Sequence, residues 1–518
     1  MKNKVLFLDG NSLSLSNLVE VAKSAEVRVE LSEKSIESIE DSRKFVEIAV
    51  ENQQVIYGIT TGFGSFKNKV VTGEQALSLQ LNIVRSHACG VGPALSLEAC
   101  RAIILLRANS LAKGFSGVRV ELIEKLLELL NKNVYPYIPE QGSVGSSGDL
   151  APLCHLSLVL IGEGECIVDG KRVPSLEVLS KLNIEPISLS YKEGLGLSNG
   201  TSVQTAILAL ALDRAMKLAD YADLIAALSV EVLMGSRMHF HRLIHEARNQ
   251  KGQIDSAHNL WSILQESPIV DSHKGCDRVQ DSYSLRCCPQ VHGASRDSIE
   301  HVFRVVSREL NAATDNPLIF TFDDLVLSGG NFHGEPIAQA ADLLKIAVSE
   351  LANISERRTA KMIDPFTNEG LPAYLVDSAL GGLHSGLMIP QYVSAALVSE
   401  NKILSHPSSV DSIPTSANQE DHVSMGTTAA RMAWKVVDNA EQVLSIELLN
   451  NTQAYEFRKE AGLSRLTKGL YDLVRSLVPA IESDRAFYLD IERIVSMFDN
   501  GCLESLISKA SFYKRCGN

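Results

Sequence analysis

The stretch TSVQTAILALALDRAMKLADYADLIAALSVEVL, residues 201–233, decides the fold class. It is rich in Ala and Leu, and the spacing predicts a helix that is apolar on most of its faces. Asp and Arg interrupt the apolar run too often for a membrane span. A helix of this kind belongs deep inside a bundle, so the segment predicts a core built from long helices.

The same helical spacing continues on both sides of this segment. Apolar residues recur three and four apart over residues 96–130, with a turn expected near 114–117, and again over 337–360 and 426–458. Alternating β-branched runs are short, as in ECIVDG from Glu165. We therefore predict a mainly α fold of long helices packed side by side.

No Pro-, Gly- or Ser-rich linker divides the chain of 518 residues. We expect one continuous structural unit with two regions. The smaller, residues 1–200, holds the first two of the unusual loops described below. The larger, residues 201–518, is the helical bundle and the C-terminal part.

Charge and composition indicate which partners, membrane associations and compartments to expect. The formal net charge is −13, which opposes nucleic-acid binding because that affinity depends on clustered Lys and Arg. The apolar run at the N-terminus ends at Asp9, too early for a signal peptide, and no window is apolar enough to cross a membrane. The nine cysteines are odd in number and show no CxxC spacing, which favours free thiols in a reducing cytoplasm.

Four breaks between predicted helices combine Gly, hydroxyl, amide and charged residues. They are YGITTGFGSF from Tyr57, GSVGSSGDLAPL from Gly142, QDSYSLRCCPQ from Gln280 and TSANQEDHVSMG from Thr415. Any one of them is typical of an ordinary loop. Four such breaks in an otherwise apolar helical chain indicate a site.

The Ser146-Ser147-Gly148 loop fits one chemistry better than two others. A phosphate loop needs a longer Gly-rich signature with a Lys, and a serine nucleophile needs GxSxG spacing within a βαβ unit; the sequence has neither. Backbone cyclisation needs a third residue without a side chain and a second residue whose hydroxyl leaves. Attack of the Gly148 nitrogen on the Ser146 carbonyl, with loss of two waters that include the Ser147 hydroxyl, would give 4-methylideneimidazol-5-one (MIO), an electrophile.

This loop resembles that of the aromatic amino acid ammonia-lyases and aminomutases. The resemblance extends from DGNSLSLSNLVEVAKS at Asp9 to LLNNTQAYEFR at Arg458, through SHACGVG, LSNGTS, SHKGCDRVQDSYSLRC, TDNPLI and SGGNFHGEP in family order. It implies a fumarase/aspartase-like helical architecture and a homotetramer with shared active sites. One departure is Ser146, where the family usually has Ala. The first residue contributes only a ring substituent, so cyclisation should survive, although a hydroxymethyl group beside the electrophile can alter reactivity or selectivity.

The resemblance also implies roles for single residues. Tyr57 would be the base that removes the β-proton, which requires a site that favours phenolate because a free tyrosine has a pKa near 10. Arg286 would anchor the substrate carboxylate, and Asp149 would assist cyclisation. Further catalytic and substrate-contacting positions are Tyr283, Asn199, Gln280 and Phe332.

Substrate choice depends on His87 and Glu420, which occupy positions similar to those of the family members that act on histidine. An imidazole offers one N–H donor and one acceptor, so Glu420 can accept from the first and His87 can complement the second. A phenyl ring would leave a buried Glu unsatisfied, which disfavours phenylalanine. Tyrosine stays open, because a histidine near position 87 can serve a phenol. Elimination and 2,3-aminomutase outcomes also both stay open.

Other interpretations are weaker. The fumarase/aspartase lyases carry GSSxMPxKxN, but Gly148-Asp149-Leu150-Ala151-Pro152 follows the two serines here, without the matching Lys or Asn. A non-catalytic relative is disfavoured, because Tyr57, Ser147, Gly148 and Arg286 are all present. His239, His241 and His245 do not share one helical face, so we expect no metal, and the built-in electrophile removes the need for pyridoxal phosphate.

Overall fold

The structure, a computed structural model, describes residues 4–56, 58–59, 61, 73–508 and 512. The chain forms two compact units that are discontinuous in sequence. Unit 1 comprises Met1–Ala211, Arg304–Asp342 and Pro407–Arg431, and unit 2 comprises Leu212–Phe303, Leu343–His406 and Met432–Asn518. Four of the five boundaries fall within α9 (Ser202–Val232), α14 (Cys288–Glu309), α15 (Glu335–Ile363) and α17 (Gly426–Glu456), and the fifth follows α16 (Met388–Leu404).

Unit 1 combines helices with four two-stranded sheets. Its helices are α1 (Leu15–Lys23), α2 (Glu33–Glu51), α3 (Gly73–His87), α4 (Leu97–Leu111), α5 (Val120–Asn131), α6 (Leu150–Leu160), α7 (Ser175–Lys181) and α8 (Glu193–Ser198). Its strands are β1 (Val5–Leu8), β2 (Arg28–Leu31), β3 (Val91–Ala94), β4 (Pro139–Gln141), β5 (Glu165–Val168), β6 (Lys171–Pro174), β7 (Leu318–Phe320) and β8 (Leu325–Leu327).

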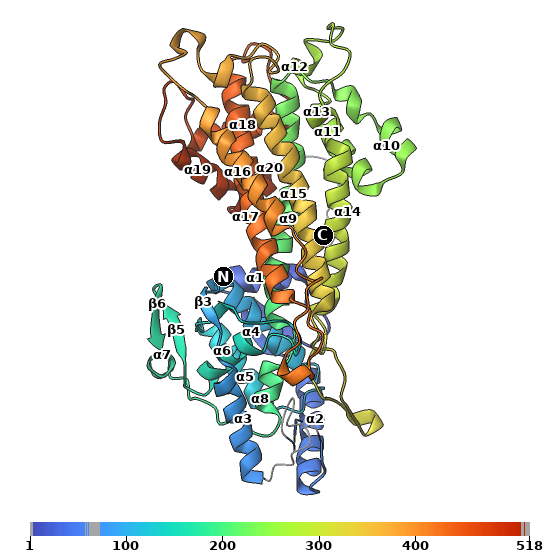
Figure 1. Cartoon of the computed structure of the whole chain (residues 1–518), viewed down its shortest axis with the longest axis vertical. Coiled ribbons are helices and arrows are strands. Elements are labelled where there is room, and N and C mark those ends of the chain that lie inside the picture. Colours follow the sequence, from blue (N-terminus) through green and yellow to red (C-terminus); the bar gives the residue numbers. More distant parts are fainter. Residues whose placement is uncertain (1–3, 57, 60, 62–72, 509–511, 513–518) are drawn as a thin grey trace. The chain divides into compact units, whose positions relative to one another are not determined.

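The sheets of unit 1 are small and locally paired. β1 and β2 are parallel, with Val5 opposite Arg28, whereas the other three pairs are antiparallel. β5 and β6 form a hairpin beside α7 (Figure 1). The predicted short extended run from Glu165 is the first strand of that hairpin.

Helix caps explain where several of these helices begin. The side chains of Ser14, Ser32 and Ser96 accept from the backbone N–H three residues later, at the starts of α1, α2 and α4. α4 is buried on every face, whereas α5 buries one face, which includes Leu122 and Leu126. The predicted helices of residues 96–130 and the turn between them are confirmed.

Unit 2 is a helical bundle with shorter helices attached. Those shorter elements are η2 (Arg237–Phe240), α10 (Arg242–Arg248), α11 (Lys251–Leu264), α12 (Pro268–Asp271), α13 (Tyr283–Arg286), α16 (Met388–Leu404), α18 (Arg465–Leu477), α19 (Phe487–Asp499) and α20 (Cys502–Ile507). The prediction of a mainly α fold with long helices side by side is confirmed (Figure 1).

Buried polar groups connect the long helices within unit 2. Arg358 of α15 pairs with Glu447 of α17, with both side chains fully buried. His292 of α14 contacts Asp223 of α9 at 2.8 Å, and Arg296 pairs with the same carboxylate. These pairs explain how Asp and Arg can interrupt the apolar segment 201–233: their charges are neutralised by neighbouring helices.

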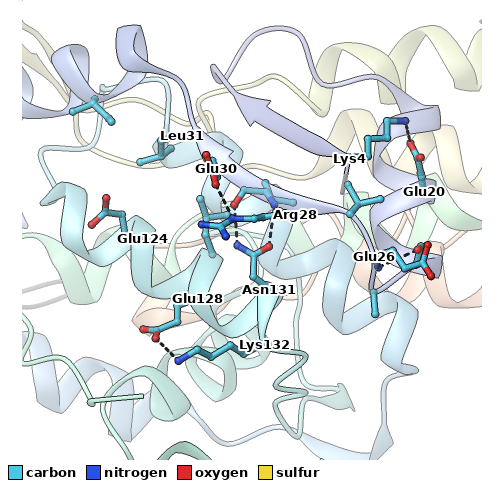
Figure 2. A pocket seen from close by; sticks show the side chains of 16 residues that line it. Lys4, Glu20, Glu26, Arg28, Glu30, Leu31, Glu124, Glu128, Asn131 and Lys132 are labelled. Atoms are coloured by element: carbon cyan, nitrogen blue, oxygen red, sulfur yellow. Dashed lines mark hydrogen bonds and ion pairs between the residues drawn. The ribbon is translucent and has the colours of Figure 1, made fainter. Parts of the chain in front are cut away.

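Two hollows of unit 1 differ in character. The larger, about 1290 Å³, lies beside β2 and α5, where Asn131 exchanges two hydrogen bonds with the Val29 backbone (Figure 2). Its cations pair locally, Lys4 with Glu20 and Lys132 with Glu128. The smaller hollow is lined in part by Ser146 and Ser147 of the Ser-Ser-Gly loop. Among the described residues, no helix is long and apolar enough to cross a membrane.

Candidate active site

The loop from Gly142 to Asp149 joins β4 to α6 and is held by segments far away in sequence. The carbonyl of Val144 accepts from the Met425 N–H at 2.9 Å. The carbonyl of Gly145 accepts from the Gly334 N–H at 3.1 Å and from the Ser424 hydroxyl at 3.0 Å. Two of the four unusual sequence breaks, those from Gly142 and Thr415, are therefore bonded directly to each other.

Gly148 occupies a position that has no room for a side chain. Its φ is +74°, and a Cβ added there would lie 2.1 Å from the carbonyl oxygen of Gly200. The neighbouring Asp149 N–H donates to that same oxygen at 2.7 Å. A residue with a side chain at position 148 would therefore collide with the Gly200 backbone.

Asp149 follows the triplet directly and is fully buried. Its carboxylate accepts from the N–H groups of Val203 and Gln204, both at 2.9 Å, and from the hydroxyls of Ser143 and Thr427. It therefore caps the start of α9, although its backbone precedes α6. Burial raises the pKa of Asp149, and the hydrogen bonds it accepts oppose this rise.

Glu420 holds both serines of the triplet. The Ser146 hydroxyl donates to Oε2 and the Ser147 hydroxyl to Oε1, each at 2.8 Å. The Thr415 hydroxyl also donates to Oε2 at 2.8 Å. Thr415 and Glu420 are paired through their backbones as well, which fixes the carboxylate beside the loop.

A cavity of about 420 Å³ borders the triplet. The predicted site residues Ser146, Ser147, Asn199, Phe332 and Glu420 line it. The Asn199 side chain is buried, and its Oδ1 has no hydrogen-bond partner among the described residues. A buried acceptor beside the triplet indicates that the cavity is built to hold a polar group.

His87 lies at the end of α3 and outside the set of described residues that line this cavity. Its Nδ1 is 2.9 Å from the Ser86 hydroxyl. Burial lowers the pKa of His87, although a hydrogen bond with the Ile83 backbone and the charge of Glu420 oppose this lowering.

The remaining predicted residues divide into two groups. Tyr57 lies outside the described residues. Gln280, Tyr283 and Arg286 belong to unit 2, where the Arg286 guanidinium lies 4.6 Å from the centre of the Tyr283 ring. Tyr283 is 71% exposed, and the buried Nε of Arg286 has no partner among the described residues.

Sequence reasoning missed several residues that line the cavity. His333 and His422 stack with ring centres 5.4 Å apart, and Asn316, Ser328 and Asp421 also line the cavity. Thr415, which holds Glu420, was missed too. All of these residues lie within the quoted motifs TDNPLI, SGGNFHGEP and TSANQEDHVSMG, so membership of a motif was the available signal.

The three histidines that we did not expect to bind a metal have other partners. His239 Nε2 contacts Asp281 at 2.9 Å, and His245 bonds through both ring nitrogens, to the His239 carbonyl and to Gln253. His241 accepts from the Leu243 N–H at the start of α10. Within the described part of the chain, no group of three His, Cys, Asp or Glu residues could hold a metal ion.

The residues present fit an MIO group made from the triplet. Gly148 has no room for a side chain, Ser147 lines the cavity, and the buried Oδ1 of Asn199, unpaired among the described residues, belongs to the same lining. Ser146, Ser147 and Gly148 would supply the ring atoms, and Asp149 would support their backbone.

Comparison with known proteins agrees with this geometry. The family model for aromatic amino acid lyases matches residues 13–476, which confirms the expectation of a carbon–nitrogen lyase. The chain belongs to the aromatic amino acid lyase family. It is 49% identical over 505 residues to the histidine ammonia-lyase of Gloeobacter violaceus, covering 98% of each chain. It is 51% identical over 500 residues to that of Bacillus subtilis, covering 96% of this chain and 97% of the other.

Solved structures share the fold over almost the whole chain. The histidine ammonia-lyase of Trypanosoma cruzi superposes with a TM-score of 0.91 at 42% identity, covering 98% of this chain and 95% of that one. The tyrosine aminomutase of Streptomyces globisporus gives a TM-score of 0.92 at 37% identity, covering 98% and 99%.

Proposed function

We propose that this chain eliminates ammonia from L-histidine and releases trans-urocanate, using an MIO electrophile formed from Ser146-Ser147-Gly148. The observation that carries the proposal is Glu420, a carboxylate that lines the cavity and is bonded to the triplet. The relatives at about half identity, which are histidine ammonia-lyases, support it.

The MIO group, once formed, would withdraw electrons from the substrate amine and make ammonia a leaving group. Side chains would remove the proton, bind the carboxylate and position the reacting groups. Tyr57 would take the β-proton, and Arg286 would hold the carboxylate through a charge-assisted pair. Tyr283, Gln280 and Asn199 would position the reacting groups, as the family resemblance implies.

Ring recognition distinguishes histidine from its competitors. Phe332 lines the cavity where the imidazole would lie, Glu420 would accept its N–H, and His87 would complement the other nitrogen. A phenyl ring offers Oε1 of Glu420 no N–H, and a site built to bind a polar ring rejects a substrate that lacks it. A second candidate, a tyrosine ammonia-lyase or an aromatic 2,3-aminomutase, is favoured by the 37% identity to a tyrosine aminomutase.

Assembly and location belong to the same proposal. The resemblance implies a homotetramer in which subunits share active sites. The exposed ring of Tyr283 and the Nε of Arg286, unpaired among the described residues, support a role in which a substrate or another subunit covers them. The acidic composition and the free cysteines support a cytoplasmic enzyme.

The test compares kcat/KM for L-histidine, L-tyrosine and L-phenylalanine on the wild type and on Glu420→Gln. We expect histidine to be preferred. In the Glu420→Gln variant kcat/KM for histidine should fall about 10- to 100-fold, which corresponds to the loss of one hydrogen bond to a charged acceptor. Asp421→Asn is the matched control, since it removes one negative charge from the adjacent cavity position. Preference for tyrosine, or equal losses in both variants, would overturn the histidine assignment.

A further inference from the structure

Ser146 bears a hydroxyl that cyclisation does not consume. In the first dehydration the Gly148 nitrogen bonds to the Ser146 carbonyl carbon, and that carbonyl oxygen leaves as water with the hydrogens of the Gly148 and Ser147 amides. In the second, the Ser147 hydroxyl leaves as water with the hydrogen of its own Cα, whose electron pair becomes the new carbon–carbon double bond. The Ser146 Oγ remains on the mature loop.

The two oxygens of Glu420 are therefore held differently before and after maturation. Oε1 accepts from the Ser147 hydroxyl, which leaves. Oε2 accepts from Ser146 and from Thr415, and both of these hydroxyls stay. Maturation removes a donor from Oε1 and leaves Oε2 with two.

This asymmetry has a consequence for ligand binding. Ser146 is 4% exposed, and its hydroxyl donates to Oε2. This hydrogen bond holds the Glu420 side chain in one rotamer before a ligand binds. Oε1 belongs to a side chain that lines the cavity. A fixed carboxylate whose second oxygen has lost its hydroxyl donor is a preorganised acceptor for a ligand N–H.

We propose that Ser146 is a positioning residue for ring recognition. Together with Thr415 it holds Oε2 of Glu420, so that Oε1, released when Ser147 loses its hydroxyl, accepts the N–H of the substrate imidazole. The inference rests on the proposed histidine activity and deepens it. It assigns a function to the hydroxyl that distinguishes this triplet from Ala-Ser-Gly.

The test uses Ser146→Ala and Thr415→Val, with Ser146→Thr as the variant that keeps the hydroxyl. Intact mass and the near-UV band of the modified triplet first establish that each variant has matured. The measurements are then KM and kcat for L-histidine, and the inhibition constants of urocanate and cinnamate. Urocanate carries an imidazole ring, whereas cinnamate carries a phenyl ring.

Ser146→Ala should mature, raise KM for histidine and the urocanate inhibition constant by about 5- to 20-fold, and change kcat less. Cinnamate offers no N–H, so its inhibition constant should stay within about twofold of the wild-type value. Ser146→Thr should recover most of the urocanate affinity, and Thr415→Val should behave like Ser146→Ala.

Two results would overturn the inference. One is a matured Ser146→Ala enzyme with unchanged histidine KM and urocanate affinity. The other is equal weakening of urocanate and cinnamate, which indicates a general loss of site structure. Failure of the proposed function looks different, because the wild type itself would then not convert histidine.

Discussion

Glu231→Gln should change how the stability of this protein depends on pH. Glu231 is buried near the end of α9, where its Oε1 accepts from the Ser267 hydroxyl at 2.6 Å and the Ser464 N–H at 2.8 Å. Its Oε2 has no partner among the described residues. Burial raises the pKa of Glu231 to about 7, although the hydrogen bonds from Ser267, Thr467 and Ser464 lower it.

The size of the effect follows from the two pKa values. The folded pKa of about 7 exceeds the ordinary value of 4.5, so the folded chain binds more protons than the unfolded chain between these values. The contribution of this group to stability is therefore fully present below pH 4.5 and is lost as the pH rises to about 7. The full loss is about 3 kcal/mol.

Glutamine imitates the protonated acid and cannot ionise. The Glu231→Gln variant and the wild type should differ by about 1 kcal/mol at about pH 5, and by about 3 kcal/mol at about pH 8.5, in favour of the variant. Urea unfolding at fixed protein concentration over this pH range measures the difference. Glu460→Gln is the control, because Glu460 is exposed and its replacement should stay within about 0.5 kcal/mol at every pH.

A difference between Glu231→Gln and wild type that does not grow with pH would refute this reasoning. It would mean that Glu231 is ionised in the folded protein, stabilised by the hydroxyl and N–H donors around it. A variant less stable than wild type at the alkaline end of the range would lead to the same conclusion.

Two further predictions concern the loop and a buried ion pair. The peptide that contains the triplet should be lighter in active protein than its sequence by the mass of two waters. The Ser147→Ala variant should keep the circular dichroism spectrum of the wild type but lose this mass difference. An unmodified triplet in active protein would contradict the mechanism. Lys192→Met should lower the free energy of unfolding by about 3–5 kcal/mol, because the variant removes one partner of the fully buried Lys192–Asp315 ion pair. A loss under about 1 kcal/mol in urea unfolding would show that the pair is not needed.

The helices were predictable because their signals are local. Side-chain spacing alone located the helix pair within residues 96–130 and the starts of α15 and α17 close to where they lie. The division into two units was not predictable, because each unit takes three separate stretches of the chain. Such a division depends on which segments pack together, and hydrophobic periodicity carries no information about that.

The sequence by itself predicted the chemistry of the triplet, because it places a carbonyl, a hydroxyl that can leave and a glycine in consecutive positions. It also singled out Glu420 by its motif. Only the tertiary structure decided that Glu420 bridges both serine hydroxyls, that Thr415 also donates to Oε2, and that Asp149 caps α9. The partners lie 54 positions apart for Asp149 and Val203, and 274 apart for Ser146 and Glu420. Their hydrogen bonds exist because the fold excludes water around groups that must still be paired.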